Sequence, residues 1–338
     1  MSYRIRVYEP NTVYAVVIRC SDQQFLLKPD HGPDSILLAS GCPLESFDRF
    51  NDTLPEPSVV GIIGAALARA QELTPINIHF CEANINHIHL GFSADVDQLQ
   101  HISDFFRNFT SYIAVKLNKK WNRNGHVFGG RYRATPCLDE ASASQQWTYA
   151  VTNVVKDYLV KTVRESPFFN TYRAIAQGKT PRYFLIDWDA YHRAGGPRKK
   201  SHCPQDYIKW MELKLTPLPA QQDWPKHKIQ SWARARVREV EERTEIELKK
   251  QQKSPMGVRA QFQTDPRSRP ATQKPATKQP ICHCADPKQK AAFKKHWRHI
   301  LSECRAASID YLQGLHDTLF PNGTYPPPKI KLQHSAFG

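Results

Sequence analysis

The sequence predicts an α+β fold in which helices cover one face of an antiparallel sheet. Two observations indicate this class. Apolar runs with strand-like alternation are separated by segments with helical apolar spacing, and residues 1–165 hold both in the order strand, helix, hairpin, helix, strand, helix. A mostly helical C-terminal extension is expected to follow, because the later segments show helical spacing or alternating charge.

The first elements are a strand, a helix and a hairpin. Residues 13–19 form an apolar run typical of a buried strand, and residues 58–73 carry apolar side chains at helical spacing. Residues 76–80 and 85–92 both alternate, and Ala83-Asn84 between them predicts a tight turn. A β-hairpin is therefore expected here.

A long helix, a short strand and a second long helix complete this part of the chain. We expect the first helix at residues 97–121, an irregular segment ending in a strand at 125–136, and the second helix as one piece at 140–164. An antiparallel sheet with this element order is ferredoxin-like in outline.

The chain after residue 165 divides by composition. Residues 166–253 are predicted to be an aromatic-rich segment followed by a charged helix from residue 226, which alternates charges and reads as a solvated or coiled-coil-like arm. Residues 254–281 are rich in proline and basic side chains, which favours a linker. Residues 282–338 return to helical spacing and predict a small C-terminal module.

Charge points to a polyanionic partner. The 338 residues carry a formal net charge of +15, which favours nucleic acid, because lipidation motifs and a cationic amphipathic anchor are not found. No apolar stretch has the length of a membrane span, and the first residues do not read as a signal peptide. We therefore expect a cytoplasmic protein with no membrane partner, whose scattered cysteines are reduced.

A strand motif and a helix motif suggest a site. In the run Asn86-His87-Ile88-His89-Leu90, the two histidines project from the same side of a strand. Tyr149 and Asn153 are four residues apart, so on a helix they share one face. Two imidazoles and one amide oxygen suit a divalent cation that grips a phosphate, although these ligand types alone do not exclude Zn²⁺.

These motifs, together with the run from Gly125 to Tyr132 (Gly-His-Val-Phe-Gly-Gly-Arg-Tyr), resemble the REP-associated tyrosine transposase group of the single-tyrosine HUH transposases. The resemblance covers roughly residues 10–165. The chain departs from the family pattern after Asn153, where Val154 stands in place of the usual proline. That departure leaves the ligand chemistry intact and affects the path by which the helix ends.

The resemblance implies a DNA transposase that cuts and rejoins single-stranded DNA bearing hairpins or palindromic repeats. It implies that Tyr149 is the nucleophile, that a 5′-phosphotyrosine forms, and that His87, His89 and Asn153 hold Mg²⁺ or Mn²⁺. No nucleotide cofactor is expected, and no Walker-type loop is found. The sequence identifies neither the proton acceptor for Tyr149 nor the choice between monomer and homodimer.

A basic and aromatic segment predicts contacts with DNA. Residues 105–138 hold seven Lys and Arg residues, no acidic residue and several aromatic ones, a composition typical of single-strand binding. The candidates lie at or beyond the end of the predicted helix. They are Lys119, Lys120, Trp121, Arg123, Arg131 and Arg133. His126 stays open between a structural, a DNA-facing and a catalytic role.

Two other functions are weighed against the transposase. A domesticated HUH-fold DNA-binding protein would keep the fold and no longer move DNA. A replication initiator or relaxase would use the same chemistry, but these enzymes arrange additional histidines or paired tyrosines differently. The complete set of Tyr149, His87, His89 and Asn153 favours the active transposase.

Overall fold

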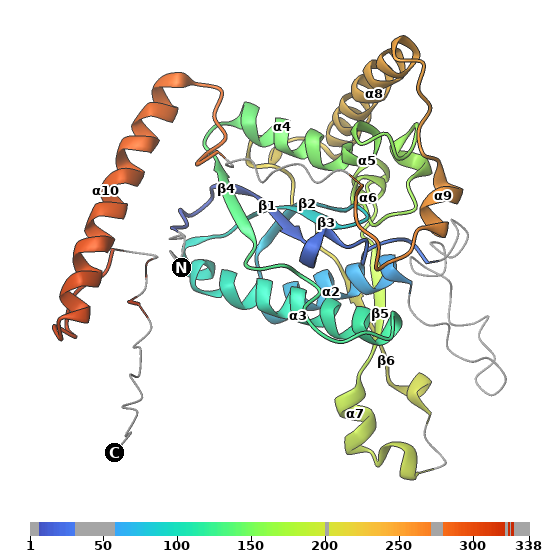
Figure 1. The fold of residues 1–338 in the computed structure, drawn as a ribbon, viewed down its shortest axis with the longest axis horizontal. Coiled ribbons are helices and arrows are strands. Elements are labelled where there is room, and N and C mark those ends of the chain that lie inside the picture. The colour runs from blue at the N-terminus through green and yellow to red at the C-terminus, as the bar shows by residue number, and fades with distance from the viewer. Residues whose placement is uncertain are drawn as a thin grey trace.

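The computed structural model describes residues 7–30, 58–199, 203–271, 280–321, 324 and 326–327. Figure 1 shows the arrangement of the elements in these ranges. The strands are β1 (Val13–Arg19), β2 (Asn77–Ala83), β3 (His87–Ser93), β4 (Arg133–Cys137), β5 (Arg182–Ile186) and β6 (Ile208–Glu212). The helices are α2 (Val59–Leu73), α3 (Ile102–Lys120), α4 (Glu140–Val151), α5 (Asn153–Lys156), α6 (Tyr172–Gln177), α7 (Trp188–Arg193), α8 (Lys226–Lys250), α9 (Val258–Gln263) and α10 (Pro287–Leu312).

The main sheet has four antiparallel strands in the order β2-β3-β1-β4, so β1 and β3 lie at its centre. Val17 of β1 pairs with His89 of β3 on one side and with Arg133 of β4 on the other. From β1 to α4, the elements follow the predicted order of strand, helix, hairpin, helix, strand and helix. The predicted α+β class with an antiparallel sheet and a helical extension is confirmed.

Helices α2 and α3 cover one face of this sheet (Figure 1). Ile88 and Leu90 share a core with Phe105 of α3, and all three side chains are fully buried. Because strand residues alternate sides, Ile88 and the two histidines that flank it project to opposite faces. Removing this apolar surface from water is the main force that holds the helices to the sheet.

Helix α4 lies across the opposite face, so the predicted one-sided covering holds for α2 and α3 but not for α4 (Figure 1). Ala143, Trp147 and Val151 are spaced four residues apart along α4 and are buried with Phe80 of β2 in a second core. This spacing places one stripe of the helix against the sheet. The helix that carries Tyr149 therefore lies on the side of the sheet to which the two histidines project.

The helix predicted at 140–164 is broken. Thr152, with φ −103° and ψ 7°, separates α4 from the single turn of α5, and Tyr158 then adopts a positive φ of 55°. The Thr152 hydroxyl donates to the carbonyl oxygen of Thr148 at 2.6 Å. Such back-bonding, together with the β-branched side chain, bends helices. Tyr149 and Asn153 therefore belong to two different helical pieces.

Helix α8 is not the solvated arm expected from its charge pattern. Ala233, Val237 and Val240 form a narrow buried stripe within it. Next to this stripe, the ring of Trp232 lies 4.6 Å from the ring of Trp147, measured between centroids. The charged residues occupy the remaining faces, which hid the stripe in the sequence. This part of the predicted extension therefore shares a core with the first 165 residues.

Strands β5 and β6 form a separate two-stranded hairpin with α7 near its tip (Figure 1). The hairpin is anchored to α2, where the Tyr183 ring fills the space above Gly64; a Cβ at that glycine would lie 2.2 Å from the ring. Two of the aromatic residues in segment 167–188, Phe169 and Tyr183, are thus buried in the same core as α2.

The segment predicted as a linker folds back onto the sheet domain over residues 254–271. The ammonium of Lys28 donates to the carbonyl oxygens of Phe262 and Thr264 at 2.9 and 2.7 Å. The buried Gln261 of α9 donates to the carbonyl oxygen of Leu159 at 2.7 Å. Proline content alone predicted a linker, whereas residues 254–271 are held against the sheet domain by hydrogen bonds from backbone and side-chain groups. Residues 272–279 of the predicted linker lie outside the described residues.

Beyond that gap, the chain joins the edge of the main sheet and then forms α10. The His283 N–H donates to the Pro136 carbonyl oxygen at 2.8 Å, and the Leu138 N–H donates to the His283 carbonyl oxygen at 2.9 Å. Helix α10 then extends away from the body of the protein (Figure 1), and the end of the predicted C-terminal module lies outside the described residues. In the part of the chain that is described, no helix combines the length and apolar character needed to span a membrane.

Candidate functional site

His87 and His89 occupy alternate positions of β3, so both side chains leave the strand on the same face. Their ring centroids are 4.8 Å apart, and the ring planes are nearly perpendicular at 89°. His89 is buried, whereas His87 is partly exposed. The structure therefore brings the two predicted imidazoles together between the sheet and α4.

Asn153 begins α5 and lies against this pair. Its Oδ1 atom is 3.0 Å from the Nε2 atom of His87, and the residue is buried. On the other side of the ring, the Nδ1 atom of His87 is 2.8 Å from the Oδ1 atom of Asn86. Both polar neighbours of His87 are thus amide oxygens, which only accept hydrogen bonds.

A neutral imidazole carries one N–H, so His87 can donate to only one of these oxygens. Burial, followed by the positive charge of Arg19, lowers the pKa of His87 to about 4, so the ring is neutral at pH 7. If Nδ1 donates to Asn86, the lone pairs of His87 Nε2 and Asn153 Oδ1 face each other. Two atoms whose lone pairs converge in this way are arranged as ligands of one cation.

His89 provides a further nitrogen atom that could bind the same cation. Its Nε2 is buried and has no hydrogen-bond partner, and burial, followed by the charges of His87 and Arg19, holds the pKa of His89 well below its ordinary value. Among the described residues, no three His, Cys, Asp or Glu side chains are grouped to hold a metal ion. The oxygen of Asn153 would have to be the third ligand, and two neutral imidazoles with one amide oxygen fit a divalent cation.

Tyr149 of α4 stands beside the histidines. Its ring meets the His89 ring edge-on, with centroids 5.4 Å apart and an interplanar angle of 88°. The side chain is 41% exposed, which leaves it accessible to a substrate. Burial of the remainder, followed by the negative charge of Asp157, raises the pKa of Tyr149 above its ordinary value. The phenol is therefore protonated near neutral pH and needs a proton acceptor to act as a nucleophile.

Asn84 is a site residue that the sequence did not reveal. It is buried, and its Nδ2 group donates to Asn153 Oδ1 at 2.9 Å and to Asp157 Oδ2 at 3.1 Å. Its own Oδ1 accepts from the Ile85 N–H at 2.6 Å. These bonds fix the amide of Asn153 with its oxygen toward His87. Asparagine is common in turns, so its position in the predicted hairpin turn hid this role.

Glu82 is a second residue that was missed. It pairs in register with His89, so both side chains lie on the same face of the sheet. Glu82 is fully buried, and neither carboxylate oxygen has a hydrogen-bond partner. Burial, followed by the charge of Asp157, raises its pKa well above the ordinary value. A carboxylate between the apolar residues Cys81 and Ala83 of a predicted hairpin was the available signal.

The predicted DNA-binding residues fall into two groups. Lys119, Arg131 and Arg133 are exposed, so their contact with DNA stays a prediction. Arg123 closes the turn after α3 by donating to Asn118 Oδ1 at 2.9 Å and to the carbonyl oxygen of the exposed His126 at 3.2 Å. No contact seen here assigns a role to the imidazole of His126.

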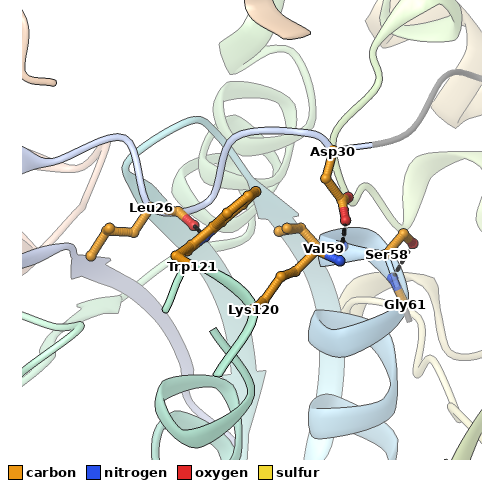
Figure 2. A network of polar contacts seen from close by, with 7 residues as sticks. All are labelled: Leu26, Asp30, Ser58, Val59, Gly61, Lys120 and Trp121. Atoms are coloured by element: carbon orange, nitrogen blue, oxygen red, sulfur yellow. Dashed lines mark hydrogen bonds and ion pairs between the residues drawn. The ribbon is translucent and has the colours of Figure 1, made fainter. Parts of the chain in front are cut away.

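Lys120 and Trp121 belong to a structural network instead (Figure 2). The Lys120 ammonium pairs with Asp30 at 2.5 Å, and only 9% and 8% of the two side chains are exposed. Asp30 also accepts from the Val59 N–H at the start of α2, at 2.9 Å. Trp121 donates from Nε1 to the Leu26 carbonyl oxygen at 3.0 Å. Contact of these two residues with DNA stays a prediction, and the structure gives both side chains a role in holding the ends of α3 and α2 in place.

Comparison with known proteins gives a weak structural likeness. No protein-family model matches the chain, and no curated protein matches it in sequence. Among solved structures, the chain is similar to a REP-associated tyrosine transposase bound to a REP hairpin, with a TM-score of 0.34 and 15% identity over 53% of this chain and 87% of that chain. A TM-score this low assigns no role to any residue, so function rests on the side chains themselves.

Proposed function

We propose that this protein is a DNA transposase that cuts and rejoins single-stranded, hairpin-bearing DNA with Tyr149 as the nucleophile. The main support is that a partly exposed phenol stands against the neutral His89 ring, which contacts a second neutral imidazole that in turn lies against a buried amide oxygen. His87, His89 and Asn153 would hold Mg²⁺ or Mn²⁺. When bound, such an ion neutralises charge on the non-bridging oxygens of a phosphodiester.

The proposed step exchanges one ester bond for another. The phenol oxygen of Tyr149 attacks phosphorus as its proton passes to an acceptor, and the bond from phosphorus to the 3′-oxygen breaks. The 3′-oxygen gains a proton and leaves as a hydroxyl, so protons balance. The products are a 5′-phosphotyrosine and a free 3′-hydroxyl. Attack by a 3′-hydroxyl reverses the step without a nucleotide cofactor.

The surrounding side chains would orient these groups. The edge of the His89 ring limits the positions open to the Tyr149 ring, and Asn84 fixes the amide of Asn153. Holding the reacting groups in line contributes strongly to a displacement of this kind. Exposed Lys119, Arg131 and Arg133 would contact the DNA backbone.

The central test is covalent capture of DNA. Hairpin-bearing single strands from the sequences that flank the gene are incubated with protein and Mn²⁺, and adducts are resolved on a denaturing gel. We expect wild type to form adducts and Tyr149→Phe to form none, because the phenyl ring has no oxygen to attack phosphorus. The matched control, Tyr158→Phe, removes the hydroxyl of a tyrosine outside the predicted site and should retain adduct formation.

Adducts of undiminished yield in Tyr149→Phe would exclude this tyrosine as the nucleophile. If wild type shifts the hairpin on a native gel and forms no adduct with Mg²⁺ or Mn²⁺, the protein is a DNA-binding protein without strand-transfer activity. A chelator should remove adduct formation more strongly than hairpin binding, since binding depends mainly on the basic surface.

A further inference from the structure

Arg19 is a cation on the rim of the candidate site. It is the last residue of β1 and pairs in register with His87, so its side chain leaves the sheet on the same face as the two histidines. Arg19 is exposed. Its charge reaches the site, because it contributes to lowering the pKa of both histidines and acts to lower that of Tyr149.

Lys156 is a second cation, and it approaches from the helical side. It is the last residue of α5, and its Nζ atom lies over the Tyr149 ring, 4.9 Å from the centroid. The residue is half-buried. The break at Thr152 allows this contact, because it separates α5 from the axis of α4. A cation over an aromatic face is attracted by the ring and is held in place by it.

Two acidic side chains, Asp157 and Glu82, also act on Tyr149. Asp157 accepts a hydrogen bond from Asn84, and its charge helps to raise the pKa of Tyr149 and opposes the net lowering of the pKa of Lys156. Glu82 is buried on the same face of the sheet as His89, and its raised pKa favours the uncharged form. Arg243 adds another positive charge near Lys156, whose pKa is lowered by burial and then by that charge.

We propose that Arg19 and Lys156 form an anion site that binds the non-bridging oxygens of the phosphodiester presented to Tyr149. The proposal rests on the proposed function, because it names the group that the site receives. Arginine offers a planar fork of N–H donors, and lysine offers a compact charge on a flexible stem. One cation comes from the end of β1 and the other from the end of α5. The two positive charges therefore act on Tyr149 from two different elements of the fold.

The test compares a charged and a neutral linkage in the same DNA. A set of hairpin-bearing oligonucleotides carries one methylphosphonate at successive linkages, and binding is measured by fluorescence anisotropy in a chelator with Tyr149→Phe protein, which keeps the ring beneath Lys156. A charge-assisted contact predicts that neutralising one particular linkage weakens binding by about tenfold. In the background of Tyr149→Phe, the further changes Arg19→Gln and Lys156→Gln should together abolish that preference.

Two matched variants control for general effects. Lys119→Gln should weaken binding of all oligonucleotides by a similar factor and keep the preference, because it removes an exposed charge on α3, which covers the face of the sheet opposite to Tyr149. Lys156→Arg should retain the preference, because it retains the charge. For each variant, the quantity compared is the ratio of its affinities for the unsubstituted and the methylphosphonate oligonucleotide. A partly unfolded preparation lowers both apparent affinities by the same factor and leaves this ratio unchanged.

The proposal is overturned if no linkage shows a preference, or if the preference persists when both cations are replaced. Failure of the proposed function gives a different result. In that case wild type forms no adduct with any oligonucleotide, while the methylphosphonate preference and its loss on removing Arg19 and Lys156 are still observed.

Discussion

Two clusters of buried polar groups in this protein are in opposite states. At the end of α3, Lys120 is paired with Asp30, and Asp30 also accepts a hydrogen bond from the first turn of α2. Between β3 and α4, buried atoms of Glu82 and His89 have no partner. Unpartnered buried polar atoms cost folding free energy and call for an explanation. The paired cluster is explained by stability, and the unpaired one is consistent with the proposed metal site.

The largest expected effect comes from breaking the paired cluster. Lys120→Ala leaves the Asp30 carboxylate buried without its counter-ion, which should lower the free energy of unfolding by about 3–5 kcal/mol. Urea unfolding measures this loss. Lys119→Ala, next to it on the exposed side of α3, should change stability by less than about 0.5 kcal/mol. Equal effects of the two substitutions would contradict the structural role of Lys120.

A smaller effect is expected from replacing Asn84, which orients a proposed metal ligand beside the unpaired cluster. Asn84→Ala removes the hydrogen bonds that orient the amide of Asn153, so apparent metal affinity should fall by roughly 10–100-fold, as for other residues that orient metal ligands. The measurement is adduct yield against Mn²⁺ concentration, and excess metal should restore most of the yield. Asn118→Ala, which frees Arg123 instead, should leave the metal dependence unchanged. A lower yield that excess Mn²⁺ does not restore would argue against a positioning role.

The smallest effect concerns how stability varies with pH. Glu82 has a higher pKa in the folded protein than in the unfolded chain, so above about pH 4.3 the folded state binds more protons and the stability contributed by Glu82 falls as pH rises. Glu82→Gln removes this dependence, so its stability relative to wild type should increase from about pH 5 upward. Thermal unfolding in a chelator measures the difference.

The control for this measurement has the opposite sign. The pKa of Glu245 is lowered, first by its hydrogen bond with Lys249, so its contribution is present above the unfolded pKa and is lost as pH falls. Glu245→Gln should therefore lose relative stability as pH rises from acid, by a small amount because the pair is exposed. A Glu82→Gln difference that does not change with pH would contradict the inferred protonation of Glu82.

The fold was predictable from sequence where a pattern was local. Alternation gave the strands and placed His87 and His89 on one face, and the spacing of Ser58 and the following apolar residues gave α2. The break at Thr152 was not predictable from periodicity, because apolar residues continue at helical spacing through it. Helix α8 was misjudged because its narrow buried stripe, in which four of the five residues are apolar, is outnumbered by charges on the other faces.

The site was predictable only for residues whose chemistry is unusual for their place. Histidines on a strand attracted attention, whereas Asn84 in a turn matched an ordinary structural role. Lys120 and Lys119 are neighbours of the same type, and no local pattern tells which one faces Asp30. That distinction depends on a contact across 90 positions of the chain (120 minus 30). Tertiary contacts of this length decide which charges are buried and which remain on the surface.

The fold-back of residues 254–271 has a consequence for how the protein is made. Lys28 leaves the ribosome early, and its acceptors on Phe262 and Thr264 follow 234 and 236 residues later. Domains generally fold from the N-terminus as they are synthesised. Here, the surface beside β1 is completed only after α9 has been synthesised. A chain terminated before α9 would leave the Lys28 ammonium and the Leu159 carbonyl oxygen without these partners, so the sheet domain would lack part of the surface that covers it.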